Sequence, residues 1–231
     1  MRPEQTLAWM ADGTERLLGD QAALSEEALS APTALPGWSR RYLLSHVAAN
    51  AEALRNLLHW AHSGEERRMY ASSEQRDADI AEGALLPAAE LRAWIESSAQ
   101  ALAADLAALP GQAWDAKVIT AQGLTRSAGE VPWMRVREVY VHAIDLGAGT
   151  RWTDLPAEFL TALLDDVTAR RSSKGGGPAL LVAATDTGHT WEVAGAGAAI
   201  PVSAPLTDLA PYLTGRPAPE LSSAPALPAW L

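Results

Sequence analysis

Glu138 and His142 are spaced so that their side chains can act together. They lie in the stretch Val131–Gly147 (VPWMRVREVYVHAIDLG), where Pro132 can open a helix and Gly147 can end one. Four residues of an α-helix return to nearly the same face, which would place the carboxylate beside the imidazole. The rest of the stretch is mostly apolar, which predicts a helix buried on several sides. The two side chains therefore form either an ordinary i,i+4 pair or part of a metal site.

His46 is a third candidate ligand, because it falls within the apolar stripe of a helix predicted over residues 40–63. Two imidazoles and one carboxylate leave one open position on a tetrahedral zinc ion, as in catalytic zinc sites, and the same set also suits non-haem Fe(II). The spacing along the chain leaves two other interpretations open. His46 can be a hydrogen-bonded core histidine, and Glu138 can pair with Arg135 or Arg137.

Three neighbouring side chains are weaker candidates. Asp145, three residues after His142, either orients that imidazole or is solvated at the surface. Asn50, one turn after His46, invites the same interpretation. Trp38, beside the start of the same helix, is the tryptophan that we expect nearest the pocket.

The composition limits the chemistry. The chain has no cysteine, so a protein disulfide, a catalytic thiolate and thiolate metal ligands are excluded, and any thiol must come from outside. A net charge of −10 argues against nucleic acid and against an anionic membrane surface as partners. No apolar run reaches the roughly 18 residues of a membrane span, and the N-terminus lacks the apolar core of a signal peptide. We therefore expect a cytoplasmic location.

The pattern of apolar residues predicts an α+β protein with two domains. We expect residues 1–150 to form a metal-binding four-helix bundle and residues 151–231 a smaller α+β domain. The predicted helices of the bundle are 4–30, which could bend near Gly13, then 40–63, 87–109 and 131–147. Between them we expect a polar connection over 64–84 and a loop or short hairpin over 110–130. The second domain is predicted to contain a helix over 155–172, strands over 179–186 and 189–195, a further strand, and a short helix over 206–215.

Two stretches carry a resemblance to a known family. LPGWSRRYLLSHVAANAEAL, which contains His46, and VPWMRVREVYVHAIDLG, which contains Glu138 and His142, resemble the mycothiol-dependent maleylpyruvate isomerases. These enzymes belong to the DinB-like metal-binding bundles, and the resemblance extends over nearly the full chain. It implies that His46, Glu138 and His142 are the zinc ligands. Many DinB-like proteins carry three histidines, whereas Glu138 takes one position here, as in the isomerase subgroup.

The resemblance also implies a function. The family's C-terminal domain resembles sterol-carrier proteins, and an arginine of that domain, matched by Arg216 in YLTGRPAP, is thought to reach the active site and bind mycothiol or substrate. The expected cofactors are Zn²⁺ and mycothiol, whose thiolate would add to maleylpyruvate, allow rotation and then leave to give fumarylpyruvate. Such a protein needs a small dicarboxylate substrate and mycothiol as its partners, and we expect a monomer. Arg216 is otherwise a solvated loop residue.

Two other functions stay open at this point. The same metal and thiol would serve a mycothiol S-transferase that acts on another electrophile. The bundle could also be a non-catalytic binding or regulatory protein, which would show no thiol-dependent turnover.

Overall fold

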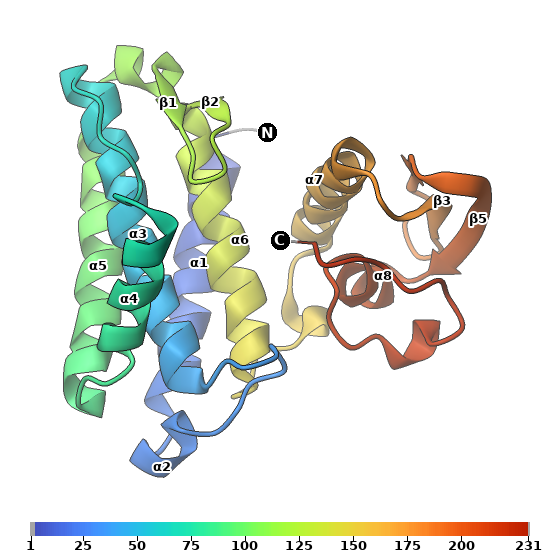
Figure 1. Cartoon of the computed structure of the whole chain (residues 1–231), viewed down its shortest axis with the longest axis horizontal. Coiled ribbons are helices and arrows are strands. Elements are labelled where there is room, and N and C mark those ends of the chain that lie inside the picture. The colour runs from blue at the N-terminus through green and yellow to red at the C-terminus, as the bar shows by residue number, and fades with distance from the viewer. Residues whose placement is uncertain (1–2, 231) are drawn as a thin grey trace. The chain divides into compact units, whose positions relative to one another are not determined.

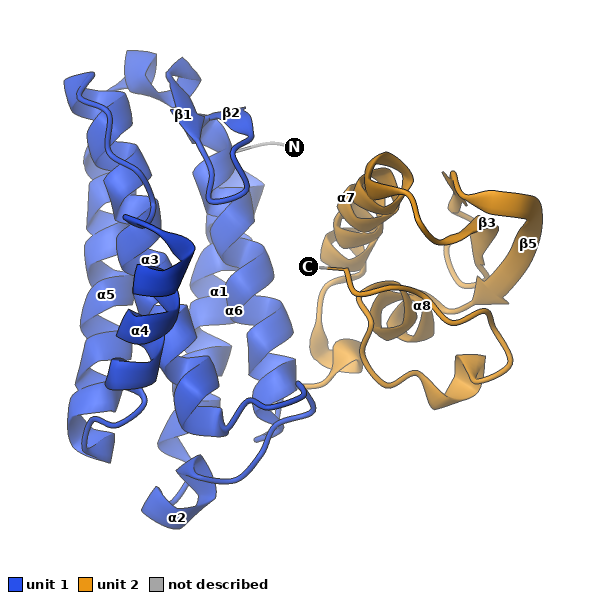
Figure 2. Ribbon diagram, viewed as in Figure 1, with its two compact units in different colours: residues 1–150 blue, residues 151–231 orange. Residues whose placement is uncertain are grey.

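A computed structural model describes residues 3–230 of the chain, so positions 1, 2 and 231 of the two predicted domains lie outside the described part. The chain forms two compact units, residues 1–150 and 151–231 (Figure 2). The first is a helical bundle, and the second combines helices with a small sheet (Figure 1). The predicted fold class is confirmed.

Four long helices make up the bundle. Helix α6 packs against α1 on one side and α3 on the other, and α3 also packs against α5. Leucine, isoleucine, valine and alanine side chains from these helices fill the space between them. The helices are α1 (Pro3–Ala22), α3 (Arg40–Ser63), α5 (Ala88–Ala108) and α6 (Val131–Leu146). The shorter elements of this unit are α2 (Glu26–Leu29), α4 (Ser73–Gly83), the 3₁₀ helices Gly111–Asp115 and Ala128–Glu130, and a hairpin of β1 (Lys117–Ile119) and β2 (Thr125–Ser127).

Local sequence signals fix the ends of the two helices that carry the candidate ligands. The Ser39 side chain accepts a hydrogen bond from the Tyr42 backbone N–H, as expected of an N-cap, and Gly64 ends α3 in the left-handed conformation. Helix α6 has Pro132 in its first turn and ends at Gly147, with φ +63°. Both helices therefore begin and end where their sequences predict.

Two expectations for the first unit are wrong. The helix predicted over 4–30 stops at Ala22, because Ser25 starts a separate helix by accepting a hydrogen bond from Ala28 N. The polar connection predicted over 64–84 contains α4, whose N-cap Ser72 accepts from Gln75 N. Ile80 is the one large apolar side chain of α4 and is fully buried, so periodicity gave little signal for this helix.

The second unit packs two helices on a three-stranded sheet. The helices are α7 (Ala157–Lys174) and α8 (Leu206–Leu213), after a short 3₁₀ helix at Trp152–Asp154; another 3₁₀ turn lies at Pro219–Leu221. The strands are β3 (Pro178–Ala184), β4 (Thr190–Val193) and β5 (Ala196–Ala204), in the order β4-β3-β5. Strand β4 is antiparallel to β3, and β5 is parallel to β3 on its other side. The segment between β4 and β5 therefore passes the N-terminal end of β3. Gly195 makes this crossing, where a Cβ would lie 2.4 Å from the Pro178 carbonyl carbon.

Within residues 3–230, no helix combines the length and the apolar character needed to cross a bilayer.

Candidate metal centre

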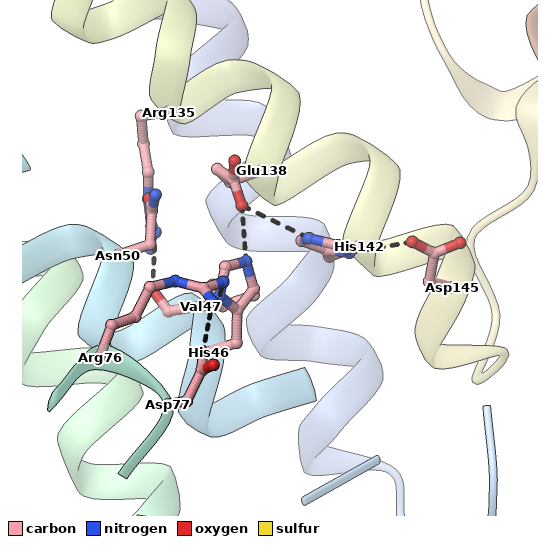
Figure 3. Close-up of polar contacts among 9 residues, drawn as sticks. All are labelled: His46, Val47, Asn50, Arg76, Asp77, Arg135, Glu138, His142 and Asp145. Carbon is pink, nitrogen blue, oxygen red and sulfur yellow. Dashed lines mark hydrogen bonds and ion pairs between the residues drawn. The ribbon is translucent and has the colours of Figure 1, made fainter. Parts of the chain in front are cut away.

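Helices α3 and α6 bring His46, Glu138 and His142 together in the bundle (Figure 3). One possible ligand atom from each side chain lies within 4.8 Å of the other two. The Glu138 Oε2 atom is 2.9 Å from His46 Nε2 and 3.4 Å from His142 Nε2. Both imidazoles therefore turn the same nitrogen toward one carboxylate oxygen. The i,i+4 pair seen in the sequence is real, and it forms one half of a larger cluster.

The three side chains are electrostatically coupled. Burial alone would raise the pKa of Glu138, but hydrogen bonds with His142 and His46 hold it well below its usual value. Burial alone would lower the pKa of His142, but hydrogen bonds with Asp145 and Glu138 raise it to about 9. Burial keeps the pKa of His46 below its usual value, although Glu138 opposes that shift. Glu138 is thus a carboxylate whose charge a cation would balance.

Asp145 and Trp38 lie close to the histidines. Asp145 is buried, and its Oδ2 atom lies 2.9 Å from His142 Nδ1, so the surface interpretation of Asp145 is wrong. This contact holds a proton on His142 Nδ1, so that Nε2, which faces Glu138, is the nitrogen that would lose its proton to bind a metal. The Trp38 ring lies 5.2 Å from the His46 ring and 6.2 Å from the His142 ring, centroid to centroid, as expected of the tryptophan nearest the pocket.

Arg135 links the two ligand-bearing helices from within the core. Its Nη1 atom donates to the Val47 carbonyl oxygen at 2.7 Å and to Asn50 Oδ1 at 3.0 Å. We expected Asn50 to orient His46, but its amide oxygen instead accepts a hydrogen bond from Arg135. This contact joins α6, three residues before Glu138, to α3, just after His46, and so fixes the two helices against each other.

Two residues near the centre come from the segment predicted as a plain connection. The Arg76 Nη2 atom of α4 lies 3.3 Å from His46 Nδ1, and the Arg76 guanidinium lies over the Tyr70 ring at 5.8 Å. Sequence reasoning missed both residues. The Ser72 N-cap was the available signal for this helix, but the surrounding residues are too polar to show a core-facing stripe.

Arg216 belongs to the second unit and follows α8 and Gly215. Its Nη1 atom donates to the Thr214 carbonyl oxygen at 2.7 Å, and its guanidinium lies over the Trp230 ring at 5.7 Å. These contacts show a guanidinium held in a defined place within that unit. The role of Arg216 in substrate or cofactor binding stays a prediction.

The donor set suits a divalent transition metal. Two imidazole nitrogens and one carboxylate oxygen face a common point, and the orientation of one imidazole is fixed by an outer carboxylate. Three protein ligands leave a tetrahedral ion one position for an exogenous group, which is the pattern of catalytic sites. The residues present therefore fit a catalytic metal such as zinc.

Comparison with known families covers almost the whole chain. The family described as the mycothiol maleylpyruvate isomerase N-terminal domain matches residues 3–147. The family described as the MDMPI C-terminal domain, which takes its name from the same enzyme, matches residues 154–230. A comparison with curated protein sequences finds no match.

Solved structures agree with the family assignment. The crystal structure of a mycothiol-dependent maleylpyruvate isomerase is 34% identical with a TM-score of 0.95, over 100% of this chain and 98% of that chain. A histidine-to-alanine mutant of such an isomerase is also 34% identical, with a TM-score of 0.91 over 94% of this chain and 91% of that chain. YfiT from Bacillus subtilis, which has an unusual four-helix bundle topology, shares the fold at 12% identity, with a TM-score of 0.54 over 63% of this chain and 84% of its own. The chain belongs to the mycothiol-dependent maleylpyruvate isomerase family.

Proposed function

We propose that this protein is a maleylpyruvate isomerase that uses mycothiol to convert the cis isomer to fumarylpyruvate. The single observation that carries the proposal is the cluster of His46, Glu138 and His142 in a chain that matches the isomerase fold from end to end. The absence of cysteine from the chain agrees with a reaction in which the nucleophilic thiol is brought by a cofactor.

Zinc is the proposed metal, held by His46, Glu138 and His142. When bound, zinc supplies a Lewis acid that favours the thiolate form of a thiol ligand, and mycothiol supplies a thiol that adds reversibly to the substrate double bond. Zinc is preferred to iron because it has no redox chemistry of its own and the isomerisation requires none.

The chain's own groups prepare this centre. Asp145 keeps the proton of His142 on Nδ1, so that Nε2 is available as a ligand. Arg135 holds α6 against α3, which preserves the distance between Glu138 and His46. The Trp38 ring lies beside both imidazoles, edge-on to His46 and closer to parallel with His142, and an apolar ring at this place would limit the access of water and strengthen electrostatic interactions beside it.

Arg216 is proposed to bind a substrate carboxylate or mycothiol. The planar guanidinium can hold a carboxylate with two parallel hydrogen bonds. The Arg216→Ala variant should keep its metal and lose turnover. Unchanged kinetics would remove Arg216 from the site. The cytoplasmic location, the monomeric state and the absence of nucleic-acid binding also stay predictions.

The test combines metal analysis with an assay of maleylpyruvate turnover in the presence and absence of mycothiol. We expect about one zinc per chain, turnover only with mycothiol, and fumarylpyruvate as the product. Turnover without any thiol would contradict the proposal. Accumulation of a stable thiol conjugate in place of fumarylpyruvate would instead identify an S-transferase. The His46→Ala variant should lose zinc and activity together, and full zinc occupancy in that variant would remove His46 from the ligand set.

A further inference from the structure

The two histidines of the metal centre have opposite neighbours on their outer nitrogens. His142 Nδ1 faces the carboxylate of Asp145, which accepts a hydrogen bond, whereas His46 Nδ1 faces the guanidinium of Arg76, which can only donate. Figure 3 shows Arg76 reaching from α4 to His46, while Asp145 lies beyond His142. The contact between His142 and Asp145 suits metal binding through His142 Nε2, whereas the contact between His46 and Arg76 would have to change when His46 Nε2 binds a metal.

Metal binding changes what Arg76 can do. A neutral imidazole that binds a metal through Nε2 carries its proton on Nδ1. In that state His46 Nδ1 is a donor and cannot accept the hydrogen bond from Arg76 Nη2, which lies 3.3 Å away in the structure. Because a guanidinium has no acceptor atom, the Arg76 guanidinium and the His46 Nδ1–H group would then face each other as two donors. Arg76 Nη2 can then donate to a different acceptor beside the loaded centre.

The fold keeps Arg76 near the centre even without that hydrogen bond. Ser45, the residue before His46, donates its hydroxyl to the Ile80 carbonyl oxygen of α4 at 2.8 Å. Gly83 allows α4 to approach closely, because a Cβ there would lie 2.4 Å from Ser45 Oγ. Helix α4 is therefore fixed on α3 beside one of the ligands, and Arg76 lies one turn before Ile80 on that helix.

The ion pair between Arg76 and Asp77 can be replaced by a pair with another carboxylate. Its Nη1 atom pairs with Asp77 Oδ1 at 2.7 Å, but the Asp77 side chain is 60% exposed, so this ion pair contributes little and can be replaced. The Arg76 side chain is 30% exposed, which makes it reachable from solvent. The Tyr70 ring lies 5.8 Å from the Arg76 guanidinium carbon, and the Tyr70 hydroxyl oxygen accepts a hydrogen bond from the Arg76 side chain. Tyr70 therefore limits the orientations that the plane of the guanidinium can adopt.

We propose that Arg76 binds a carboxylate of the substrate beside the metal centre. This inference rests on the proposed function, because maleylpyruvate is a dicarboxylate and the reacting thiol is expected at the same centre. The planar fork of Arg76 matches a carboxylate, and a bidentate pair fixes the direction of the substrate as well as its charge. Arg76 is thus a substrate-binding residue, supplied by helix α4, which the sequence pattern did not predict.

The test compares Arg76→Gln and Arg76→Lys with the wild type and with Arg68→Gln as a control. Arg68 lies in the same segment, but it pairs with Glu66 and its side chain is 51% exposed. The probe is maleate, a cis dicarboxylate, whose binding to zinc-loaded protein is measured by calorimetry without mycothiol. Zinc content is measured in each variant, together with kcat and KM for maleylpyruvate in the presence of mycothiol.

We expect Arg76→Gln to keep its zinc, to bind maleate about 10- to 100-fold more weakly, and to raise KM for maleylpyruvate by a similar factor. Arg76→Lys should recover part of the affinity, since it restores the charge without the fork, and Arg68→Gln should match the wild type. Equal maleate affinity in wild type and Arg76→Gln, or no maleate binding by the wild type, would overturn the proposal. Loss of zinc from Arg76→Gln would also overturn it, because Arg76 would then act on the metal site.

The maleate measurement separates this proposal from the proposed function. If the wild type fails to isomerise maleylpyruvate but maleate binding depends on Arg76, the function is wrong and the carboxylate site stands. If the wild type isomerises maleylpyruvate and the Arg76→Gln substitution does not change maleate affinity, the proposed isomerase function stands and the proposed role of Arg76 is wrong.

Discussion

The two faces of α6 do different work. The face toward α1 is closely packed, with Val139 and Tyr140 pressed against Gly13 of α1. The face toward α3 carries Arg135, Glu138 and His142, which are polar groups that form hydrogen bonds with α3 or an ion pair within α6. A single helix thus has a close apolar contact on one face and the candidate metal ligands on another. The comparison teaches that substitutions on one face should leave the properties of the other face largely intact.

Glu138→Gln should have the largest effect, and it tests the polar face. The amide cannot supply the negative charge that the metal requires, so we expect loss of zinc and a fall in turnover well beyond the roughly 100-fold that loss of an outer-shell partner costs. Zinc should raise the melting temperature of the wild type and not that of the variant, because only a bound ligand stabilises the folded state. The measurements are metal content, turnover, and melting temperature with and without zinc.

A control for this substitution is Glu90→Gln, at an exposed position in the first turn of α5. Its zinc content and turnover should equal those of the wild type. Equal zinc binding by Glu138→Gln and Glu90→Gln would show that Glu138 is not a ligand. The face of α6 toward α3 would then not be distinguished from the other face by metal binding through Glu138.

Gly13→Ala tests the packed face. A Cβ at this position would lie 2.6 Å from Val139 Cγ2 and 3.1 Å from the Tyr140 ring, and a β-branched valine has little freedom to move away. Overpacking costs typically 1–3 kcal/mol, which exceeds the gain of up to about 1 kcal/mol from placing alanine in a helix. We expect a net loss of about 1–2 kcal/mol in the free energy of unfolding, measured by urea denaturation, with zinc content unchanged.

Gly19→Ala is the matched control on the same helix, because nothing lies within 4 Å of its added Cβ. It should stabilise the protein by about 0.5–1 kcal/mol. The diagnostic result is a change in the free energy of unfolding that is a loss for Gly13→Ala and a gain for Gly19→Ala. A shift in the same direction for both would mean that helix propensity, and not contact with α6, sets the stability of α1.

Asp145→Asn sharpens the polar side of the comparison. The amide can present either an acceptor or a donor to His142 Nδ1, so the ring proton is no longer fixed there and Nε2 is less available as a ligand. We expect zinc affinity to fall by about 10- to 100-fold, measured by competition with a chromophoric chelator. An unchanged affinity would show that the His142 ring is oriented by packing alone.

The sequence predicted the bounds of helices α3 and α6 better than the contacts between these helices. Apolar periodicity and the signals at Ser39, Pro132 and Gly147 locate α3 and α6, because helix ends depend on residues within one turn. The convergence of His46 on Glu138 could not be derived from spacing, since the contact joins two helices whose relative positions depend on the packing of the whole bundle. The family resemblance supplied that pairing.

The errors have a common physical origin. The separate start of α2 at Ser25 and the presence of α4 both depend on local caps within polar stretches, where apolar periodicity is weak. Arg76 was missed with α4, because its place beside His46 depends on the packing of α4 on α3, which includes the hydrogen bond between Ser45 and Ile80. The partner of Asn50 was misjudged because Arg135, on another helix, competes for its amide oxygen.

Tyr140→Phe should have the smallest effect, and it tests whether the packed face is purely apolar. The Tyr140 hydroxyl donates to Asp12 Oδ2 of α1 at 2.7 Å, and Arg16 also donates to that oxygen. The Asp12 side chain is 43% exposed, so we expect a loss of less than about 1 kcal/mol in the free energy of unfolding at pH 7.

The pH dependence identifies the source of that loss. Burial would raise the pKa of Asp12, but hydrogen bonds from Arg16 and Tyr140 lower it below its usual value of 3.8. The ionised Asp12 therefore adds to the free energy of unfolding above pH 3.8, and this contribution is lost as the pH falls through the lowered pKa. The difference between wild type and Tyr140→Phe, measured by urea denaturation, should therefore shrink on acidification from pH 7 toward about pH 3. If the difference is the same at both ends of this range, the hydroxyl stabilises α1 against α6 through packing, and the division between a packed face and a polar face of α6 holds without the hydrogen bond.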